Sequence, residues 1–162
     1  MDLRTFLLCF ILSVVSFSCS NSTKEFPKTI NGKVIRIKDG DTIEILYDDK
    51  PLTIRFAHVD CPEIKESQPF GKVAKQFTSD LCFGQIVNVE NDNQFDRYDR
   101  LIGVIINSKG DTVNLELVKA GLAWHYKQYS SDTLYSKTES VARQNKIGLW
   151  ADLNPIAPWD WR

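Results

Sequence analysis

Residues 29–57 read TINGKVIRIKDGDTIEILYDDKPLTIRFA, and this stretch decides the fold. Apolar runs precede and follow Asp39-Gly40-Asp41, and an Asp-Gly pair in that setting is typical of a β-hairpin. A second turn is expected at residues 48–51. After it, polar and apolar residues alternate, so Arg55 points away from the face that is shared by Leu52, Ile54 and Phe56. The stretch therefore predicts three consecutive strands.

The rest of the chain predicts a helix, two strands and two more helices. Apolar residues at helical spacing indicate a first helix that ends near Gly84, and they are Phe70, Val73, Ala74, Phe77 and Leu81. Residues 86–90 and 101–106 are expected to be strands. Asn114 is a suitable N-cap for the next helix. Ser130 or Ser131 would cap the last helix, with inward-facing residues Leu134, Val141 and Ala142.

This order of elements predicts a mainly β, α+β fold. Five short strands with an intervening helix are typical of an OB-fold barrel, here with three α-helices, and the face of such a barrel often binds nucleic acid. A mixed α+β sandwich has a compatible order. The length of 162 residues suits one domain, which we expect over residues 29–150.

The first 19 residues read as an export signal. An apolar run from Phe6 to Phe17 is short for a membrane span and suits the core of a signal peptide. Ser18 before Cys19 resembles a bacterial lipoprotein processing site, which would leave Cys19 as a lipidated N-terminus on the periplasmic or extracellular side of a membrane. Cleavage near Ser18 and secretion is the alternative. Residues 20–28 would be a tether.

Charge and cysteine content narrow the chemistry. The formal net charge is −1, so a nucleic-acid partner would be held by a local patch and a metal rather than by the overall field. Cys61 and Cys82 could form a disulfide in an exported domain, or could be buried thiols. Only two histidines exist, His58 and His125, so a zinc site is disfavoured and both are expected to be structural.

Polar residues gather at four places that lie at strand ends or in adjoining loops: residues 39–42, Arg55, residues 60–63 and residues 96–100. Carboxylates suit calcium or magnesium, and arginine forks suit phosphate oxygens. A further carboxylate can act as general base toward water. Taken singly, these are ordinary turn acids and surface charges. Their joint occurrence predicts a site that cleaves phosphodiesters.

Five segments resemble, in order and spacing, the thermonuclease (staphylococcal-nuclease-like) family. The likeness runs from about residue 30 to residue 150 and rests on residues 39–42 (DGDT), 54–56 (IRF), 59–63 (VDCPE), 96–100 (DRYDR) and 116–123 (ELVKAGLA). The resemblance implies a calcium-dependent endonuclease that cuts DNA and RNA to fragments with 3′-phosphate ends. We expect a monomer that prefers single-stranded or frayed substrate.

The resemblance also implies the metal ligands and the base. Asp41 and Asp60 would be carboxylate ligands of one Ca²⁺, and the backbone carbonyl of Cys61 would be a further ligand. Glu63 would be the general base, or the residue that orients the attacking water. Such a site keeps several waters, so its calcium affinity is expected to be modest.

Arg55 and Arg100 would hold the target phosphate and stabilise the charge gained in the transition state. Tyr126 is placed by position near the bound nucleotide. The sequence departs from the family pattern at Asp99, where glycine is common, and this acid could pair with Arg100 or point into solvent. Many members are also markedly basic, and this chain is not.

The tail, residues 151–162, is rich in proline and tryptophan. Trp159 and Trp161 could clasp the barrel, or could stack on bases of a single strand. Two other functions fit parts of the pattern. A non-catalytic OB-fold module would lack Glu63 or one of the two arginines, and none is missing. A structural lipoprotein that merely binds calcium would give no reason for both arginines.

Overall fold

The computed structural model describes residues 25–162. The predicted export signal and the lipidation of Cys19 lie outside the described residues. Within residues 25–162, no helix combines the length and the apolar character that crossing a membrane requires.

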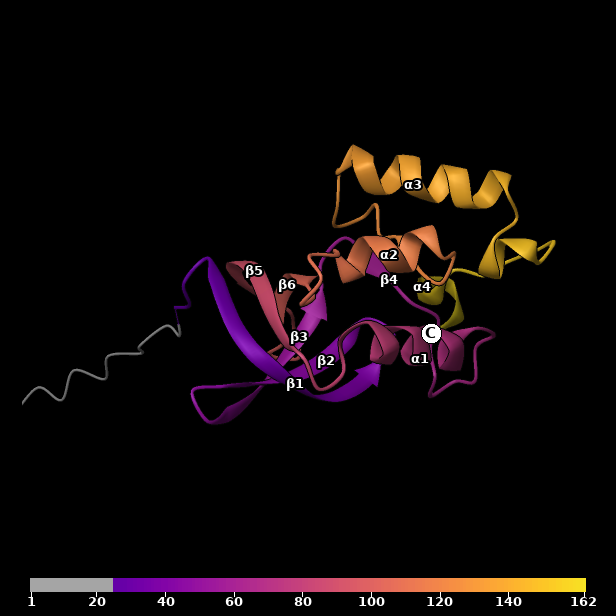
Figure 1. Ribbon diagram of the computed structural model, residues 1–162. Coiled ribbons are helices and arrows are strands. Elements are labelled where there is room, and N and C mark those ends of the chain that lie inside the picture. The colour runs from indigo at the N-terminus through magenta and orange to yellow at the C-terminus, as the bar shows by residue number, and fades with distance from the viewer. Residues whose placement is uncertain (1–24) are drawn as a thin grey trace, which may run out of the picture.

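A closed five-stranded barrel forms the body of the protein, as predicted, so the sandwich alternative is wrong (Figure 1). Its strands run in the order β1-β2-β3-β6-β5. Their bounds are β1 (Thr29–Asp39), β2 (Thr42–Tyr47), β3 (Lys50–Phe56), β5 (Ile86–Phe95) and β6 (Leu101–Ile106). Neighbours are antiparallel except β3 and β6, whose parallel pairing closes the barrel.

The hairpin from β2 to β3 follows the residue types of the turn. Asp48 and Asp49 both have positive φ, 47° and 58°, and a turn with two such residues matches the twist of the flanking strands. Beyond the turn, the alternation predicted for β3 is present, with Leu52, Ile54 and Phe56 buried in the core. The core therefore sits inside the barrel, as the period of two requires.

Gly40 joins β1 to β2 at a point where the chain is crowded. A Cβ atom at this position would lie 2.8 Å from the Cβ of Ala74 and 2.9 Å from the Cβ of Cys61. Only glycine leaves room for α1 (Gly71–Cys82) to pack here. The Thr78 hydroxyl donates to the Gly40 carbonyl and fixes the helix against the turn.

The helix α2 (Val113–Lys119) packs beside the barrel, and α3 (Thr133–Gln144) lies over α2 (Figure 1). The predicted N-cap at Asn114 is wrong, because the N-cap is Thr112, two residues earlier, and the helix begins at Val113. Asn114 is instead fully buried. Its side chain accepts from the N–H of Ile105 and donates to the carbonyls of Ala57 and Gly103. It thus fastens α2 to β6 and to the end of β3.

The start of α3 also differs from the prediction. The N-cap is Asp132, whose carboxylate accepts from the N–H of Leu134, whereas the Ser130 hydroxyl is engaged by two histidines. Of the three residues predicted to face inward, only Ala142 does. Leu134 and Val141 are exposed, and the buried residues are Tyr135, Glu139 and Ala142.

Four short elements complete the fold. The strands β4 (Val59–Asp60) and β7 (Trp124–His125) pair antiparallel, and α4 (Pro158–Trp161) follows the 3₁₀ helix η1 (Gly148–Ala151). The helix α4 lies against the loop before α1, where Trp161 Nε1 donates to the carbonyl of Glu66. Cys61 and Cys82 are buried free thiols rather than a disulfide.

The first described residues pack onto the barrel. Phe26, within the segment expected to be a tether, is 7% exposed and lies in the core, where its ring contacts Tyr47 and Phe95. The Asn93 amide donates to the Phe26 carbonyl. The ordered domain therefore begins by residue 26, a few residues before the predicted start at residue 29.

Candidate active site

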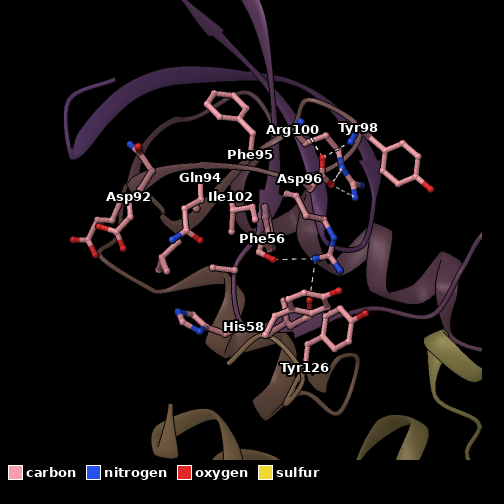
Figure 2. Close-up of a pocket in the computed structure, with 18 of the residues that line it drawn as sticks. Phe56, His58, Asp92, Gln94, Phe95, Asp96, Tyr98, Arg100, Ile102 and Tyr126 are labelled. Carbon is pink, nitrogen blue, oxygen red and sulfur yellow. Dashed lines mark hydrogen bonds and ion pairs between the residues drawn. The ribbon is translucent and has the colours of Figure 1, made fainter. Parts of the chain in front are cut away.

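The predicted site residues meet at one end of the barrel, beside a cavity of about 1130 Å³. The cavity is lined by β3, β5, the start of β6 and the segment after β7. In Figure 2, Asp96, Tyr98 and Arg100 lie on one side of it, and His58 and Tyr126 lie on the opposite side.

The register of the strands explains this convergence. Thr42, the first residue of β2, is paired with Arg55 on β3. The parallel pairing of β3 with β6 sets Arg55 beside Ile102, so Arg100, two residues earlier, enters β6 close to Arg55. The pairing of β4 with β7 sets Asp60 beside Trp124. Residues from distant parts of the chain are thus brought to one end of the barrel by backbone hydrogen bonds.

Arg55 is the centre of the cluster. Its side chain is 11% exposed, and its Nη1 donates to the carbonyls of Phe56 and Val59, both at 2.9 Å. Its Nη2 lies 2.7 Å from Asp60 Oδ1 and 3.3 Å from Asp41 Oδ2. One guanidinium nitrogen therefore lies between the two carboxylates that the sequence predicts as metal ligands.

Asp41 is buried and held on both oxygens. Its Oδ2 accepts from the N–H of Cys61 at 2.6 Å, and its Oδ1 accepts from the Thr42 hydroxyl at 3.2 Å. The same hydroxyl accepts from Arg100 Nη1 at 3.2 Å. Thr42 thereby joins the second predicted arginine to the acidic cluster.

Arg100 is oriented by Asp96 rather than by Asp99. Its Nε lies 2.6 Å from Asp96 Oδ2, and the Asp96 side chain also accepts from the backbone N–H of Arg100. Asp99 is exposed and has a φ of 58°, a conformation that favours glycine and that aspartate also adopts. Asp99 therefore suits the turn, and the ion-pair partner of Arg100 is Asp96.

Glu63 lies in the loop that follows β4, and a residue that the sequence did not single out reaches it. Arg162 places Nη1 2.7 Å from Glu63 Oε1 and Nη2 2.6 Å from Asp60 Oδ2. The loop is held in turn by Gln68, whose side-chain oxygen accepts from the N–H of Glu63. Gln68 thus holds the backbone of the predicted base, and Arg162 forms an ion pair with its carboxylate.

Burial sets the proton affinities in this cluster. Burial and the nearby charge of Asp41 raise the pKa of Asp60, against the opposing influence of Arg55 and Arg162. Burial likewise raises the pKa of Glu63 above its ordinary value, with Arg162 opposing the shift. Asp39 reaches a pKa of about 6, mainly through burial and the charge of Asp41. A carboxylate with a raised pKa is a better proton acceptor, which suits a general base.

The donor set fits a hard cation at an open site. Asp41 and Asp60 are 6% and 1% exposed, and both contact the same guanidinium nitrogen, so their oxygens already face one position of positive charge. Across residues 25–162, no group of three or more His, Cys, Asp or Glu side chains is arranged to hold a metal. A cation here would rely on two carboxylates, main-chain oxygen and water, which calcium accepts.

Aromatic side chains border the cavity. Tyr126, the predicted nucleotide neighbour, lies on its wall and stacks on Trp159 with ring centroids 5.2 Å apart and an interplanar angle of 2°. Trp159 also packs edge-on against Trp124. The tail therefore packs as a clasp, the first of the two alternatives that the sequence left open, and the clasp ends beside the site.

The two histidines have structural partners. His58 Nδ1 and His125 Nε2 lie 2.8 Å and 2.9 Å from the hydroxyl oxygen of Ser130, and His125 Nδ1 lies 2.9 Å from that of Ser136. Both rings also pack on Tyr135. These contacts join the loop before α3 to the end of β3, in agreement with the structural role predicted for both residues.

All five side chains on which the sequence prediction depends, Asp41, Arg55, Asp60, Glu63 and Arg100, thus belong to one connected cluster. The sequence did not reveal three further members. Asp96 stood in a quoted motif without a role, and Thr42 read as a turn residue. Arg162 carried no signal beyond its place after Trp161.

Comparison of the sequence with known proteins identifies the family to which the chain belongs. A model described as staphylococcal nuclease homologue matches residues 53–152. An uncharacterized endonuclease of Escherichia coli O157:H7 is 41% identical over 133 residues, which cover 82% of this chain and 85% of the relative. An uncharacterized endonuclease of Haemophilus influenzae is 43% identical, with 80% and 71% covered. A micrococcal nuclease of Shigella flexneri is 37% identical, with 81% and 79% covered. Barrel, site and relatives agree that the chain belongs to the staphylococcal nuclease homologue family.

Proposed function

We propose that the protein is a calcium-dependent endonuclease that hydrolyses phosphodiester bonds of DNA and RNA and leaves 3′-phosphate ends. The observation that carries the proposal is the meeting of two buried carboxylates, a third carboxylate and two arginines beside one large cavity. The names of the relatives, endonuclease and micrococcal nuclease, support it. Catalysis, rather than binding alone, is favoured because every member of the set is present.

The roles follow from what each group can do. Calcium, held by Asp41 and Asp60 with the carbonyl of Cys61, would supply positive charge to a phosphate oxygen. Arg55 and Arg100 line the cavity and are oriented by their own partners, so their positive charges can stabilise the remaining phosphate oxygens. Glu63, with its raised pKa, would take the proton of the attacking water.

The decisive test is cleavage of heat-denatured DNA and of RNA with EDTA and with added calcium. We expect EDTA to abolish cleavage and calcium to restore it. Asp41→Asn should be inactive at all calcium concentrations, because it removes a buried ligand. Asp48→Asn is the matched control, since Asp48 is exposed in the distant β2–β3 turn and asparagine suits its positive φ. Cleavage that is indifferent to chelation would contradict the metal assignment.

We propose further that the protein is exported and tethered to a membrane through lipidated Cys19. The support is the sequence pattern of residues 1–19. Cys19→Ser should move the protein from the membrane fraction to the soluble fraction. The control is Cys9→Ser, because Cys9 lies in the apolar run of the signal. We expect this variant to remain associated with the membrane. Membrane association of the Cys19→Ser variant would contradict lipidation at this residue.

A further inference from the structure

Arg162 is the member of the cluster for which the proposed mechanism has no use. Its fork spans two carboxylates, with Nη1 2.7 Å from Glu63 Oε1 and Nη2 2.6 Å from Asp60 Oδ2. These are the proposed base and a proposed calcium ligand. With Arg55 on the other oxygen of Asp60, both oxygens of that carboxylate are bonded to guanidinium groups. Arg162 thus forms two of the five ion pairs between arginine and carboxylate in the cluster, and these two call for a function.

The position of Arg162 is built by the fold. Ala157 and Pro158 are buried, and the side chain of Gln68 donates to the carbonyl of Ile156 at 2.8 Å. Trp161 Nε1 donates to the carbonyl of Glu66 at 3.3 Å. Several contacts therefore hold α4 against the loop that carries Glu63. The Arg162 side chain itself is 41% exposed, so its guanidinium can leave the carboxylates while the helix stays in place.

The same guanidinium also borders the substrate cavity. Arg162 lines it together with Arg55, Arg100 and Tyr126. A guanidinium with a flexible stem at the edge of such a cavity can bind a phosphate as readily as a carboxylate, because both present paired oxygens to its fork. Two sets of acceptors therefore compete for Arg162.

We propose that Arg162 is a third phosphate-binding arginine of the substrate site, which rests on Asp60 and Glu63 until substrate arrives. This inference depends on the proposed nuclease function and deepens it. In the resting arrangement Arg162 neutralises the carboxylates that a cation needs, so it opposes calcium. When substrate brings a phosphate, Arg162 exchanges its carboxylate partners for phosphate oxygens. It then favours substrate and leaves Glu63 free to accept a proton.

The proposal predicts two effects of opposite sign in Arg162→Gln. Calcium should bind the substrate-free variant more tightly than the wild-type protein, and a nucleotide should bind it more weakly. A charge-assisted hydrogen bond is of the size that changes an equilibrium constant by about tenfold, so each effect is expected to be about tenfold. Calorimetric titration measures the first with calcium alone. The second uses thymidine 3′-phosphate at saturating calcium, since this ligand has no bond for the enzyme to cut.

Two further variants separate phosphate binding from general charge. Arg97 is an exposed cation on the wall of the same cavity, and it makes no ion pair with Asp60 or Glu63. Arg97→Gln should therefore leave calcium affinity unchanged. Arg162→Lys keeps the charge without the fork and should fall between the wild-type protein and Arg162→Gln for nucleotide affinity. If the role of Arg162 were purely structural, Arg162→Gln would bind both calcium and the nucleotide more weakly.

The outcomes are distinct. Tighter calcium binding together with weaker nucleotide binding by Arg162→Gln, relative to the wild-type protein, supports the proposal. Two unchanged affinities, two affinities that move in the same direction, or the same pair of changes in Arg97→Gln would overturn it. If the wild-type protein binds calcium and cuts DNA while Arg162→Gln behaves like it, the inference about Arg162 fails and the proposed function stands. If the wild-type protein does neither, the proposed function fails as well.

Discussion

Replacing Arg55 with methionine should destabilise the protein strongly when calcium is absent. Methionine keeps much of the volume of arginine and removes its charge and all its donors. Asp41 and Asp60 would remain buried, 6% and 1% exposed, without the guanidinium that lies 3.3 Å and 2.7 Å from them. The carbonyls of Phe56 and Val59 would also lose a donor.

Breaking a buried ion pair from one side costs about 3–5 kcal/mol, since the partner charge stays behind. Here that charge is mainly the one on Asp41, because Asp60 keeps its contact with Arg162. For a domain of this size that loss corresponds to a fall in the melting temperature of about 10–20 °C. Calcium neutralises the same carboxylates and should return part of the loss. An ion at 100 times its Kd adds about 2.7 kcal/mol. Urea unfolding of Arg55→Met, with EDTA and with calcium, measures both quantities.

Arg36→Met is the matched control. Arg36 lies on β1, its side chain is 69% exposed, and it is 3.4 Å from Glu44. An exposed pair of this kind contributes about 0–1 kcal/mol. If Arg55→Met and Arg36→Met lose the same small amount of stability, or if calcium fails to stabilise Arg55→Met, the argument that Asp41 and Asp60 need Arg55 or calcium to compensate their charge is refuted.

Three other changes test separate parts of the structure. Glu63→Gln should lower kcat by about 10²–10⁴-fold and leave DNA binding nearly intact, as initial rates and fluorescence anisotropy would measure, whereas an equal loss of binding would contradict the base role. Burial lowers the pKa of His58 and His125 below 6.5, so the unfolded chain takes up protons that the folded chain does not. The free energy of unfolding should therefore fall as the pH drops below about 6.5, and His58→Asn, which suits the φ of 69°, should reduce this dependence. Asn114→Ala should cost about 3 kcal/mol in urea unfolding, because it removes three hydrogen bonds to the backbone, and of their partners only the Gly103 carbonyl keeps another donor, the N–H of Ala57. Asn145→Ala on the exposed end of α3 should cost under about 1 kcal/mol.

Alternation and turn chemistry predicted the strands, and their order favoured the barrel while leaving a mixed α+β sandwich as an alternative. The period of two in residues 52–57 placed Arg55 opposite the core face, and the Asp-Gly pair placed a turn before Asp41. These are local rules, and the structure follows them because each strand buries one face. The caps of α2 and α3 were wrong for a non-local reason. Asn114 and Ser130 are engaged by partners on β6, β3 and β7, and such bonds are invisible in a local window.

The site could be predicted only as far as motifs extend. Asp41, Arg55, Asp60, Glu63 and Arg100 each stood in a segment with a recognisable pattern. Arg162 stands 102 positions after Asp60 and reaches it through the packing of α4. No periodicity or spacing encodes such a contact, because it depends on how a short helix docks on a loop.

The limits of the family match carry a practical lesson for producing the protein. A recombinant fragment trimmed to residues 53–152 would lack β1, β2 and α4. It would have an open sheet in place of a barrel, with two unpaired edges that invite aggregation. It would also lack Asp41 and Arg162, the two ends of the charged cluster. Expression should therefore keep residues 25–162 together, and an affinity tag is better placed before Glu25 than after Arg162.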